Sequence, residues 1–199
     1  MQERILNKAT EMFFSYGIKS VTMDDIAGEM GVSKKTIYRF FEDKNSIVEQ
    51  VIGNLIENHG EKVISCHQHA QNAIHEVVLQ VESLSQLLQV IKPGILYDVQ
   101  KYFPNVWAKI NGHKYQCVLQ GIVRNLERGV SEKIYRPYPD INTVSYIRLQ
   151  QINSVFNQID YPTRLEPGNL LGQISEMYLY GIASPEGQNL IPEYLNTKN

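Results

Sequence analysis

The side chains best suited to chemistry in this chain lie close together near the amino terminus. Between residues 30 and 41 there are positive charges and hydroxyl groups but no acid, at Lys34, Lys35, Arg39, Ser33, Thr36 and Tyr38. Such groups donate hydrogen bonds to phosphate oxygens, and a lysine also reaches O6 and N7 of guanine in the major groove. The local field sets the approach to phosphates, so the net charge of −2 does not oppose this interpretation. These residue types predict contact with double-stranded nucleic acid.

Two short helices around a sharp turn are expected to position these groups. Thr22, followed three positions later by Asp25, forms a capping-box pattern that starts a helix ending near residue 30. Gly31 follows where the chain must turn, because glycine accepts a positive φ without a Cβ clash. Ser33 is placed to cap the next helix, which is predicted over residues 34–41.

The second of these helices is amphipathic. Ile37 and Phe41 are four residues apart, so both are expected to point into the core. The cationic and hydroxyl side chains then occupy the remaining surface. A helix whose first residues meet base edges while its neighbour crosses the backbone is the helix-turn-helix arrangement. A three-helix unit with a merely solvated basic helix is the alternative interpretation.

The string from Val21 to Lys44, VTMDDIAGEMGVSKKTIYRFFEDK, resembles the DNA-binding domain of the TetR family of bacterial transcriptional regulators. The family pattern there is close to VTMDDIAxxxGVSKxTIYxxFxxK, and the match is continuous over about residues 3 to 48. The resemblance implies a sequence-specific DNA-binding transcriptional regulator. In this family such a protein is usually a ligand-responsive repressor that binds a pseudo-palindromic operator as a homodimer.

The resemblance assigns DNA contacts to Thr22, Ser33, Lys34, Lys35, Thr36, Tyr38, Arg39 and Lys44. Thr22 opens a helix whose amino-terminal dipole favours phosphate, and Lys44 matches the position at which the family usually clamps phosphate. Lys34 and Lys35 are the candidate base readers, although either lysine alternatively contacts phosphate alone. Tyr38 matches the family's backbone-contacting tyrosine, or is an exposed packing aromatic.

Two positions depart from the family pattern. Phe40 stands where many relatives carry His or another hydrogen-bonding aromatic, so no phosphate contact is expected from this side chain. Lys35 stands where the family often has a small residue, and it adds a charge.

The whole chain is predicted to be all-α. A helix-turn-helix DNA-binding domain is expected over residues 1–46, and an all-helical ligand-binding and dimerisation domain over residues 47–199. Apolar periodicity predicts helices over about 2–16, from 44 into the sixties, and over 70–90, 104–128, 141–158 and 168–183. Prolines mark the breaks between these segments, at Pro93, at 135–139 and in the loop from Pro162 to Pro167.

The resemblance implies that the last two predicted helices pair with a second subunit as a four-helix bundle. Their apolar faces supply the predicted contacts Ile147, Ile152, Val155, Phe156, Leu170, Ile174, Met177, Tyr178 and Gly181. Packing within the subunit's own core is the alternative. A two-fold dimer places two reading helices roughly 34 to 36 Å apart or a multiple of this, so the operator should be a pseudo-palindrome.

The resemblance also implies a small apolar or aromatic effector among the middle helices. Pockets combine an apolar lining with a few polar groups, which here predicts Tyr97, Tyr102, Phe103, Trp107, His113, Gln116 and Cys117. These residues are alternatively ordinary core. An effector that induces must favour the state that fits DNA less well.

Composition and motifs argue against other classes. No apolar run approaches the roughly 20 residues that span a bilayer, and the segment MQERILNKA is polar and helical rather than a secretory signal. Two cysteines, Cys66 and Cys117, make no disulfide framework, which fits a reduced bacterial cytoplasm. There is no P-loop, HExxH or GxSxG motif, and the YxxxK spacing of Tyr97 and Lys101 lacks the Gly-rich loop of a dehydrogenase. We expect no enzyme, no cofactor and no metal.

Two other functions stay open. One is a DNA-binding regulator of the same fold without a small-molecule effector, acting through a protein partner. The more distant one is a metal or redox sensor that uses the cysteines and histidines, of which Cys66 and His69 share a helix face. A closed apolar cavity between the middle helices would favour the effector, and a filled core would favour the protein partner.

Overall fold

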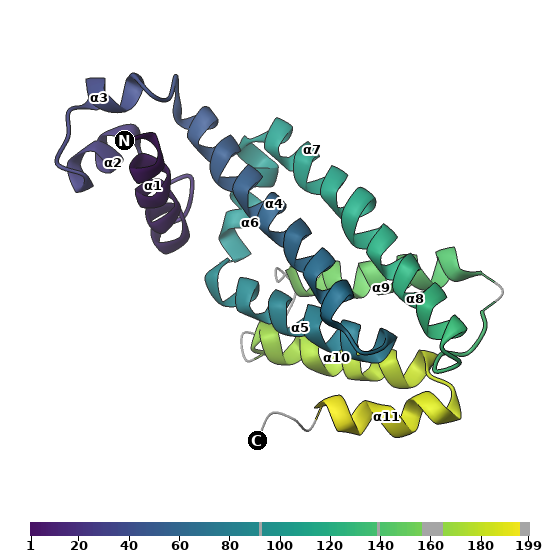
Figure 1. Cartoon of the computed structure of the whole chain (residues 1–199). Helices are drawn as coiled ribbons and strands as arrows, with labels where there is room; N and C mark the ends of the chain where they lie inside the picture. Colours follow the sequence, from purple (N-terminus) through teal and green to yellow (C-terminus); the bar gives the residue numbers. More distant parts are fainter. Residues whose placement is uncertain (92, 139, 157–164, 196–199) are drawn as a thin grey trace. The chain divides into compact units, whose positions relative to one another are not determined.

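The computed structural model describes residues 1–91, 93–138, 140–156 and 165–195, and every regular element in these ranges is helical (Figure 1). The elements are α1 (Gln2–Tyr16), α2 (Met23–Glu29), α3 (Lys34–Tyr38), α4 (Lys44–His69), α5 (Ala73–Val90), α6 (Pro93–Tyr102), α7 (Pro104–His113), the π-helical turn η1 (Lys114–Leu119), α8 (Gln120–Ser131), α9 (Ile141–Phe156), α10 (Pro167–Ile182) and α11 (Pro185–Leu195). The predicted all-α class is confirmed.

The helices form two compact units, one of Met1–His59 with Val90–Gly112 and one of Gly60–Gln89 with His113–Asn199. The predicted domains 1–46 and 47–199 divide the chain at a different place. They assign functions rather than packing, and as such they stay a prediction.

The first unit has an apolar core built around α1. This helix buries Ile5, Ala9, Met12 and Phe13, which recur at the spacing of one helix face. Helices α2 and α3, the first turns of α4, and α6 and α7 contribute to the same core. The predicted end of α1 at Gly17 is confirmed, since Gly17 has a φ of 89° and its N–H donates to the carbonyl of Phe13.

The turn between α2 and α3 closes on Gly31. The N–H of Gly31 donates to Gly28 O at 3.1 Å and that of Val32 to Ala27 O at 3.0 Å, which is a Schellman motif. Gly31 has a φ of 63°, in the left-handed region that a side chain disfavours. This turn sets the direction in which α3 leaves α2.

Helix α3 ends at Tyr38, earlier than the predicted 41. Asp43 caps α4, with its Oδ1 accepting the N–H of Ser46 at 2.8 Å, so the chain must leave the helical path before it. Phe41 still reaches the core, because its N–H donates to Ile37 O in a last turn.

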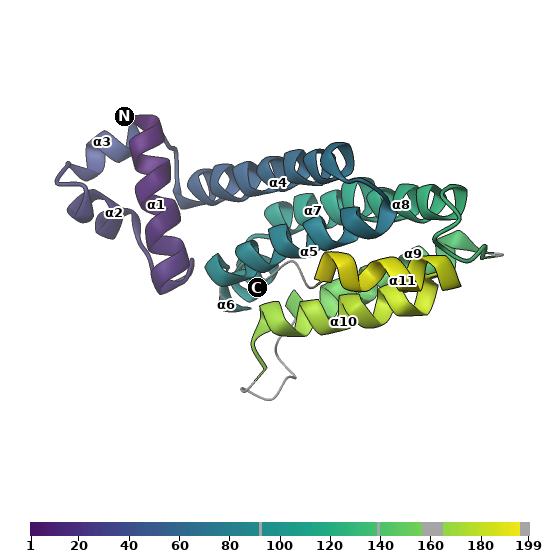
Figure 2. The ribbon, with the colours of Figure 1, turned by 60° about the horizontal axis from the view of Figure 1, so that its bottom comes forward.

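The second unit is a layered helical bundle in which α8 packs on α9, α9 on α10 and α10 on α11. Helix α11 lies alongside α10 in both views (Figures 1 and 2). A partly buried ion pair ties α5 to α8, where Arg128 donates to Glu76 at 3.1 Å and also to Glu132 and to the carbonyl of Ala70. This arginine therefore has counter-charges and carbonyls around its guanidinium.

The ring of Tyr135 lies directly on the backbone of α8. A Cβ placed on Gly129 would come within 2.0 Å of this ring. The hydroxyl of Tyr135 donates to Asn125 Oδ1 at 3.3 Å, and the Asn125 amide donates to the carbonyl of Ala73 at 2.9 Å. The Asn125 amide thus joins α8 to the start of α5, and the Tyr135 hydroxyl is bonded to the oxygen of the same amide.

Helix α11 was not predicted, since the last predicted helix ends at residue 183. Its signal was nevertheless present: Ser184 accepts the N–H of Gly187 at 3.2 Å, and Pro185 occupies the first position of the helix. The predicted helix from Pro104 is found as α7, η1 and α8. The predicted end at Gln158 and the loop residue Pro162 lie outside the described residues.

The two glycines of the α2–α3 connection should respond oppositely to alanine. Gly31→Ala should lower the free energy of unfolding by about 1–2 kcal/mol, because the side chain is forced into the left-handed region. Gly28→Ala should raise it by about 0.5–1 kcal/mol, since Gly28 is helical and has open space around its Cα. Urea unfolding followed by circular dichroism measures both, and an equal effect of the two substitutions would contradict this account.

Candidate nucleic-acid interface

The amino terminus of α2 is fixed by a reciprocal cap. The Thr22 hydroxyl accepts the N–H of Asp25 at 3.1 Å, and the Asp25 carboxylate accepts the N–H of Thr22 at 2.8 Å and its hydroxyl at 2.7 Å. The predicted capping box is confirmed. The hydroxyl and then the backbone amide of Thr22 lower the pKa of Asp25 below its ordinary 3.8. Thr22 itself is exposed, so it remains open to solvent beside this cap.

One side of helix α3 packs into the core of the first unit, and the opposite side is exposed to solvent. Ile37 is completely buried and Phe41 is 2% exposed, as predicted. The exposed side of the helix and the turn after it carries Ser33, Lys34, Lys35, Tyr38, Arg39 and Phe40. The sequence therefore places the apolar anchor and the cationic surface on opposite sides of one short helix.

The first turn of α3 uses its hydroxyl groups for capping. Ser33 Oγ accepts the N–H of Thr36 at 3.2 Å, and the two side-chain oxygens are 2.8 Å apart. Ser33 remains exposed, whereas Thr36 is half-buried. Either hydroxyl can accept or donate one further bond to a partner on the open side.

The lysines of α3 have different surroundings. The ammonium of Lys34 lies 2.8 Å from Asp24 Oδ1 and 2.9 Å from Oδ2, and this hydrogen bond raises the pKa of Lys34. Among the residues that the structure describes, Lys35 and Arg39 have no acidic partner. Asp24 was not predicted as a neighbour of Lys34, although it lies in the first turn of α2 and its carboxylate reaches the Lys34 ammonium on α3.

Lys44 has a different environment from the lysines of α3. It is half-buried, and its ammonium donates to the backbone carbonyl of Lys19 at 3.2 Å. Burial lowers the pKa of Lys44, while the charges of Asp98 and Asp25 oppose this. Lys44 therefore joins the loop after α1 to the start of α4. The N–H of Lys19 in turn donates to Asp98 on α6 at 2.9 Å.

The seven predicted pocket residues are distributed over both units, and their common lining stays a prediction. Tyr97, Tyr102, Phe103 and Trp107 belong to the first unit, and His113, Gln116 and Cys117 to the second. Tyr97 and Tyr102 are exposed and contact the ammonium of Lys101, because an aromatic ring attracts a cation on its face. Phe103 is part of the first core.

The nine predicted dimer contacts also divide by burial. Ile152, Val155 and Tyr178 are buried in the core of the second unit, where they leave almost no surface for a partner. Ile147 is 53% exposed and Met177 74% exposed, and Gly181 is exposed as well. Phe156, Leu170 and Ile174 are half-buried. Helix periodicity alone does not separate an inward stripe from an outward one when both are apolar.

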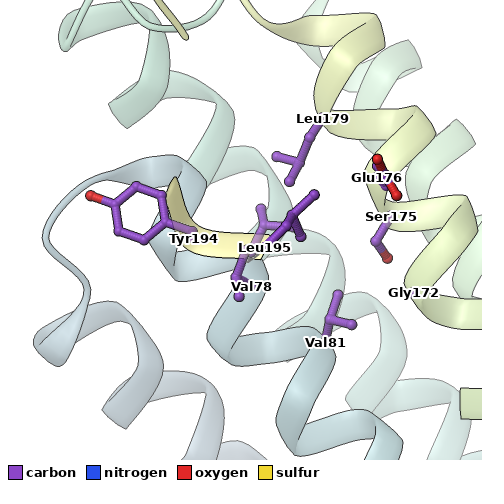
Figure 3. Close-up of a pocket in the computed structure, with 9 residues that line it drawn as sticks. Val78, Val81, Gly172, Ser175, Glu176, Leu179, Tyr194 and Leu195 are labelled. Carbon is purple, nitrogen blue, oxygen red and sulfur yellow. The ribbon is translucent and has the colours of Figure 1, made fainter. Parts of the chain in front are cut away.

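A pocket that the sequence did not predict lies between α5, α10 and α11 (Figure 3). It is lined by Val77, Val78, Val81, Gly172, Ser175, Glu176, Leu179, Tyr194 and Leu195. None of the predicted pocket residues takes part. Among the described residues no group of three or more His, Cys, Asp and Glu side chains is arranged to hold a metal ion, and no helix is long and apolar enough to cross a membrane.

Comparison with known proteins agrees with this geometry. Residues 5–51 match the profile of the family described as bacterial regulatory proteins, tetR family. The chain is 24% identical over 191 residues to the uncharacterized HTH-type transcriptional regulator YvaF of Bacillus subtilis, covering 94% of this chain and 97% of that protein. It is 21% identical over 142 residues to IcaR of Staphylococcus aureus, a negative transcriptional regulator of the biofilm operon icaADBC, covering 70% of each.

The fold is shared with solved structures. One is the transcriptional regulator FadR of Bacillus subtilis in complex with stearoyl-CoA, with a TM-score of 0.70 at 17% identity over 92% of this chain and all of that one. These relatives are transcriptional regulators and not enzymes, which agrees with the prediction that this chain is no enzyme.

The cap of α2 should make stability depend on pH. The folded-state pKa of Asp25 is lowered, so its carboxylate stabilises the protein above about pH 4 and loses this effect as the pH falls through the lowered pKa. Asp25→Asn should therefore be less stable than the wild type at neutral pH, with a difference that shrinks and vanishes in acid. Urea midpoints measured at a series of pH values test this, and a difference independent of pH would contradict it.

Proposed function

We propose, from the fact that the chain belongs to the TetR family of DNA-binding transcriptional regulators, that it works as a homodimer on a pseudo-palindromic operator. The observation that carries this proposal is the exposed cationic surface of α3, held in place by the buried Ile37 and Phe41. In the dimer, two copies of α3 enter successive major grooves on one side of the duplex.

The environment of each charge suggests its part in binding. Lys35 has no acidic partner among the described residues, so it is the first candidate to reach a guanine edge. To contact DNA, Lys34 would break its ion pair with Asp24. The free energy lost is small, because exposed ion pairs contribute about 0–1 kcal/mol. Thr22, Ser33, Thr36, Tyr38, Arg39 and Lys44 would contact the phosphate backbone.

The proposed regulation is repression relieved by a small molecule. IcaR is a negative regulator, and FadR was solved with an acyl-CoA, which support this direction for a protein of the same fold. The pocket between α5, α10 and α11 is the candidate for the effector site, because it combines an apolar lining with a few polar groups.

A regulator without a small-molecule effector is the second candidate. The exposure of Tyr97 and Tyr102 on α6, at 46% and 39%, favours it, since exposed aromatic side chains are typical of surfaces that contact other proteins. In this case α6 would receive the protein partner.

Selection of bound sites from random duplex should return an inverted repeat, and alanine substitutions should then separate two kinds of contact. Lys44→Ala should weaken binding to all duplexes about equally and reduce the slope of log Kd against log salt by about 1. Lys35→Ala should change the preference at one base pair by about 1–3 kcal/mol. Lys62→Ala, an exposed lysine of the second unit, removes the same charge and is the control.

Unchanged operator binding by Lys34→Ala, Lys35→Ala and Lys44→Ala together would overturn the assignment of α3 as the reading helix. A selected site without two-fold symmetry would instead contradict the dimeric arrangement.

The dimer should depend on the exposed apolar side chains of α9 and α10. Ile147→Asp should give monomers in sedimentation velocity, because a carboxylate at a packed apolar interface is left without a partner. Ile64→Asp makes the same change at an isoleucine that is equally exposed, 56% against 53%, on α4. It should leave the dimer intact. A dimer of unchanged stability in Ile147→Asp would place the interface elsewhere.

A further inference from the structure

The second unit contains a buried arginine without a counter-charge. Arg148, in the middle of α9, is 4% exposed. One terminal nitrogen donates to Ser175 Oγ at 2.7 Å, and the guanidinium carbon lies 4.6 Å from the centre of the Tyr178 ring. The other terminal nitrogen is buried without a hydrogen-bond partner. No ion pair of the described residues includes Arg148.

A guanidinium in such a place is costly, because burial removes its hydration and nothing of opposite charge replaces it. The same unit shows the usual solution at Arg128, which has two carboxylates and a backbone carbonyl around it. Burial lowers the pKa of Arg148 to about 10, so the group is still charged at neutral pH. The core therefore keeps a positive charge that no described residue neutralises.

Two more unsatisfied polar atoms lie in the same neighbourhood. Tyr178 OH and Gln151 Oε1 are buried without a hydrogen-bond partner. Tyr178 packs against Arg148, and Gln151 lies one turn further along α9. A guanidinium N–H and a phenol O–H are donors that a carboxylate accepts, whereas the Gln151 oxygen is itself an acceptor and takes no part in holding an anion. The chemistry of the donors selects an anion.

Ser175 connects this charge to the pocket. Its hydroxyl accepts the bond from Arg148 and donates to Leu171 O at 2.6 Å, and the same residue lines the pocket between α5, α10 and α11. The close-up shows Ser175 on α10 near Val81, with Leu179 further along the same helix (Figure 3). Glu176 also lines the pocket and is exposed, and its negative charge disfavours an anion beside it. The carboxylate of a ligand is therefore expected on the side of Ser175.

We propose that the pocket between α5, α10 and α11 binds a small amphipathic carboxylate, with its carboxylate reaching the guanidinium of Arg148 beside Ser175 and its apolar part held by Val78, Val81 and Leu179. This inference rests on the proposed response to an effector and names its chemical class. The ligand would supply the negative charge that the core lacks, so binding removes an existing penalty as well as adding contacts.

The test uses octanoate as the probe and 1-octanol as its neutral counterpart, with the full-length protein and no DNA. Octanoate should raise the Tm of the wild type by about 3 °C at ten times its Kd, and 1-octanol should raise it less. Arg148→Met should bind octanoate about thirtyfold more weakly or worse in calorimetry. Without ligand its Tm should equal or exceed that of the wild type, because an uncompensated buried charge is gone.

Two further variants keep the result interpretable. Arg124→Met removes an exposed arginine of α8 in the same unit and should bind octanoate like the wild type. Arg148→Lys keeps the charge without the planar fork and should bind with intermediate affinity. It also serves if Arg148→Met does not fold.

The proposal is overturned if octanoate, hexanoate and benzoate all leave the Tm unchanged at millimolar concentration, or if Arg148→Met binds octanoate like the wild type. Asp160 is the only acidic side chain outside the described residues. Non-additive stabilities of Asp160→Asn and Arg148→Met would show that the arginine is paired within the chain, which also overturns it.

Operator binding separates this inference from the proposed function. Arg148-dependent octanoate binding that weakens operator binding supports both. Arg148-dependent binding of octanoate by a protein that binds no selected duplex supports the site and contradicts the proposed function. The same binding without any change in operator affinity supports the site and contradicts its role as the effector site.

Discussion

The burial of Ile37 and Phe41 holds the exposed cationic side chains of α3 in place. Helix α3 has five residues, far fewer than the 12 or so that an isolated helix needs in water. Its position therefore comes from these two side chains in the core of the first unit, together with the Gly31 turn before it and the Asp43 cap after it. The cationic side chains stay exposed, because α3 is held mainly by residues on its opposite side and at its two ends.

Three basic side chains of this protein lie in three different environments. The Lys34–Asp24 pair is exposed, so it can be exchanged for another partner at little cost. Arg128 is paired with Glu76 and Glu132 and stabilises the junction of α5 and α8 only while both partners are present. Arg148 is buried with one hydroxyl and one aromatic ring as its neighbours. The surroundings of Lys34, Arg128 and Arg148 therefore give these three basic side chains different roles.

Sequence was most informative where structure is decided by near neighbours. The capping box of Thr22 and Asp25, the positive φ at Gly31 and the Asp43 cap were all predictable, because each depends on residues three or four positions apart. The division of apolar residues between inside and outside was not predictable: Tyr178 and Met177 are adjacent in α10, yet one is buried and the other is 74% exposed. The pocket joins α5 to α10 and α11, which are far apart in the chain, so no local pattern indicates it. Helix α11 lies beyond the last predicted helix, although the Ser184 cap at its start is a local signal.

The contact of Tyr135 with Gly129 makes these two positions interdependent. The aromatic ring occupies the space that any side chain at position 129 would fill, so a larger residue there is tolerated only with a smaller one at 135. That exchange would remove the phenol from Asn125 and leave its buried amide with one partner, the carbonyl of Ala73. Three positions therefore behave as a single packing unit, and a variant of this protein that changes one of them alone should be hard to obtain.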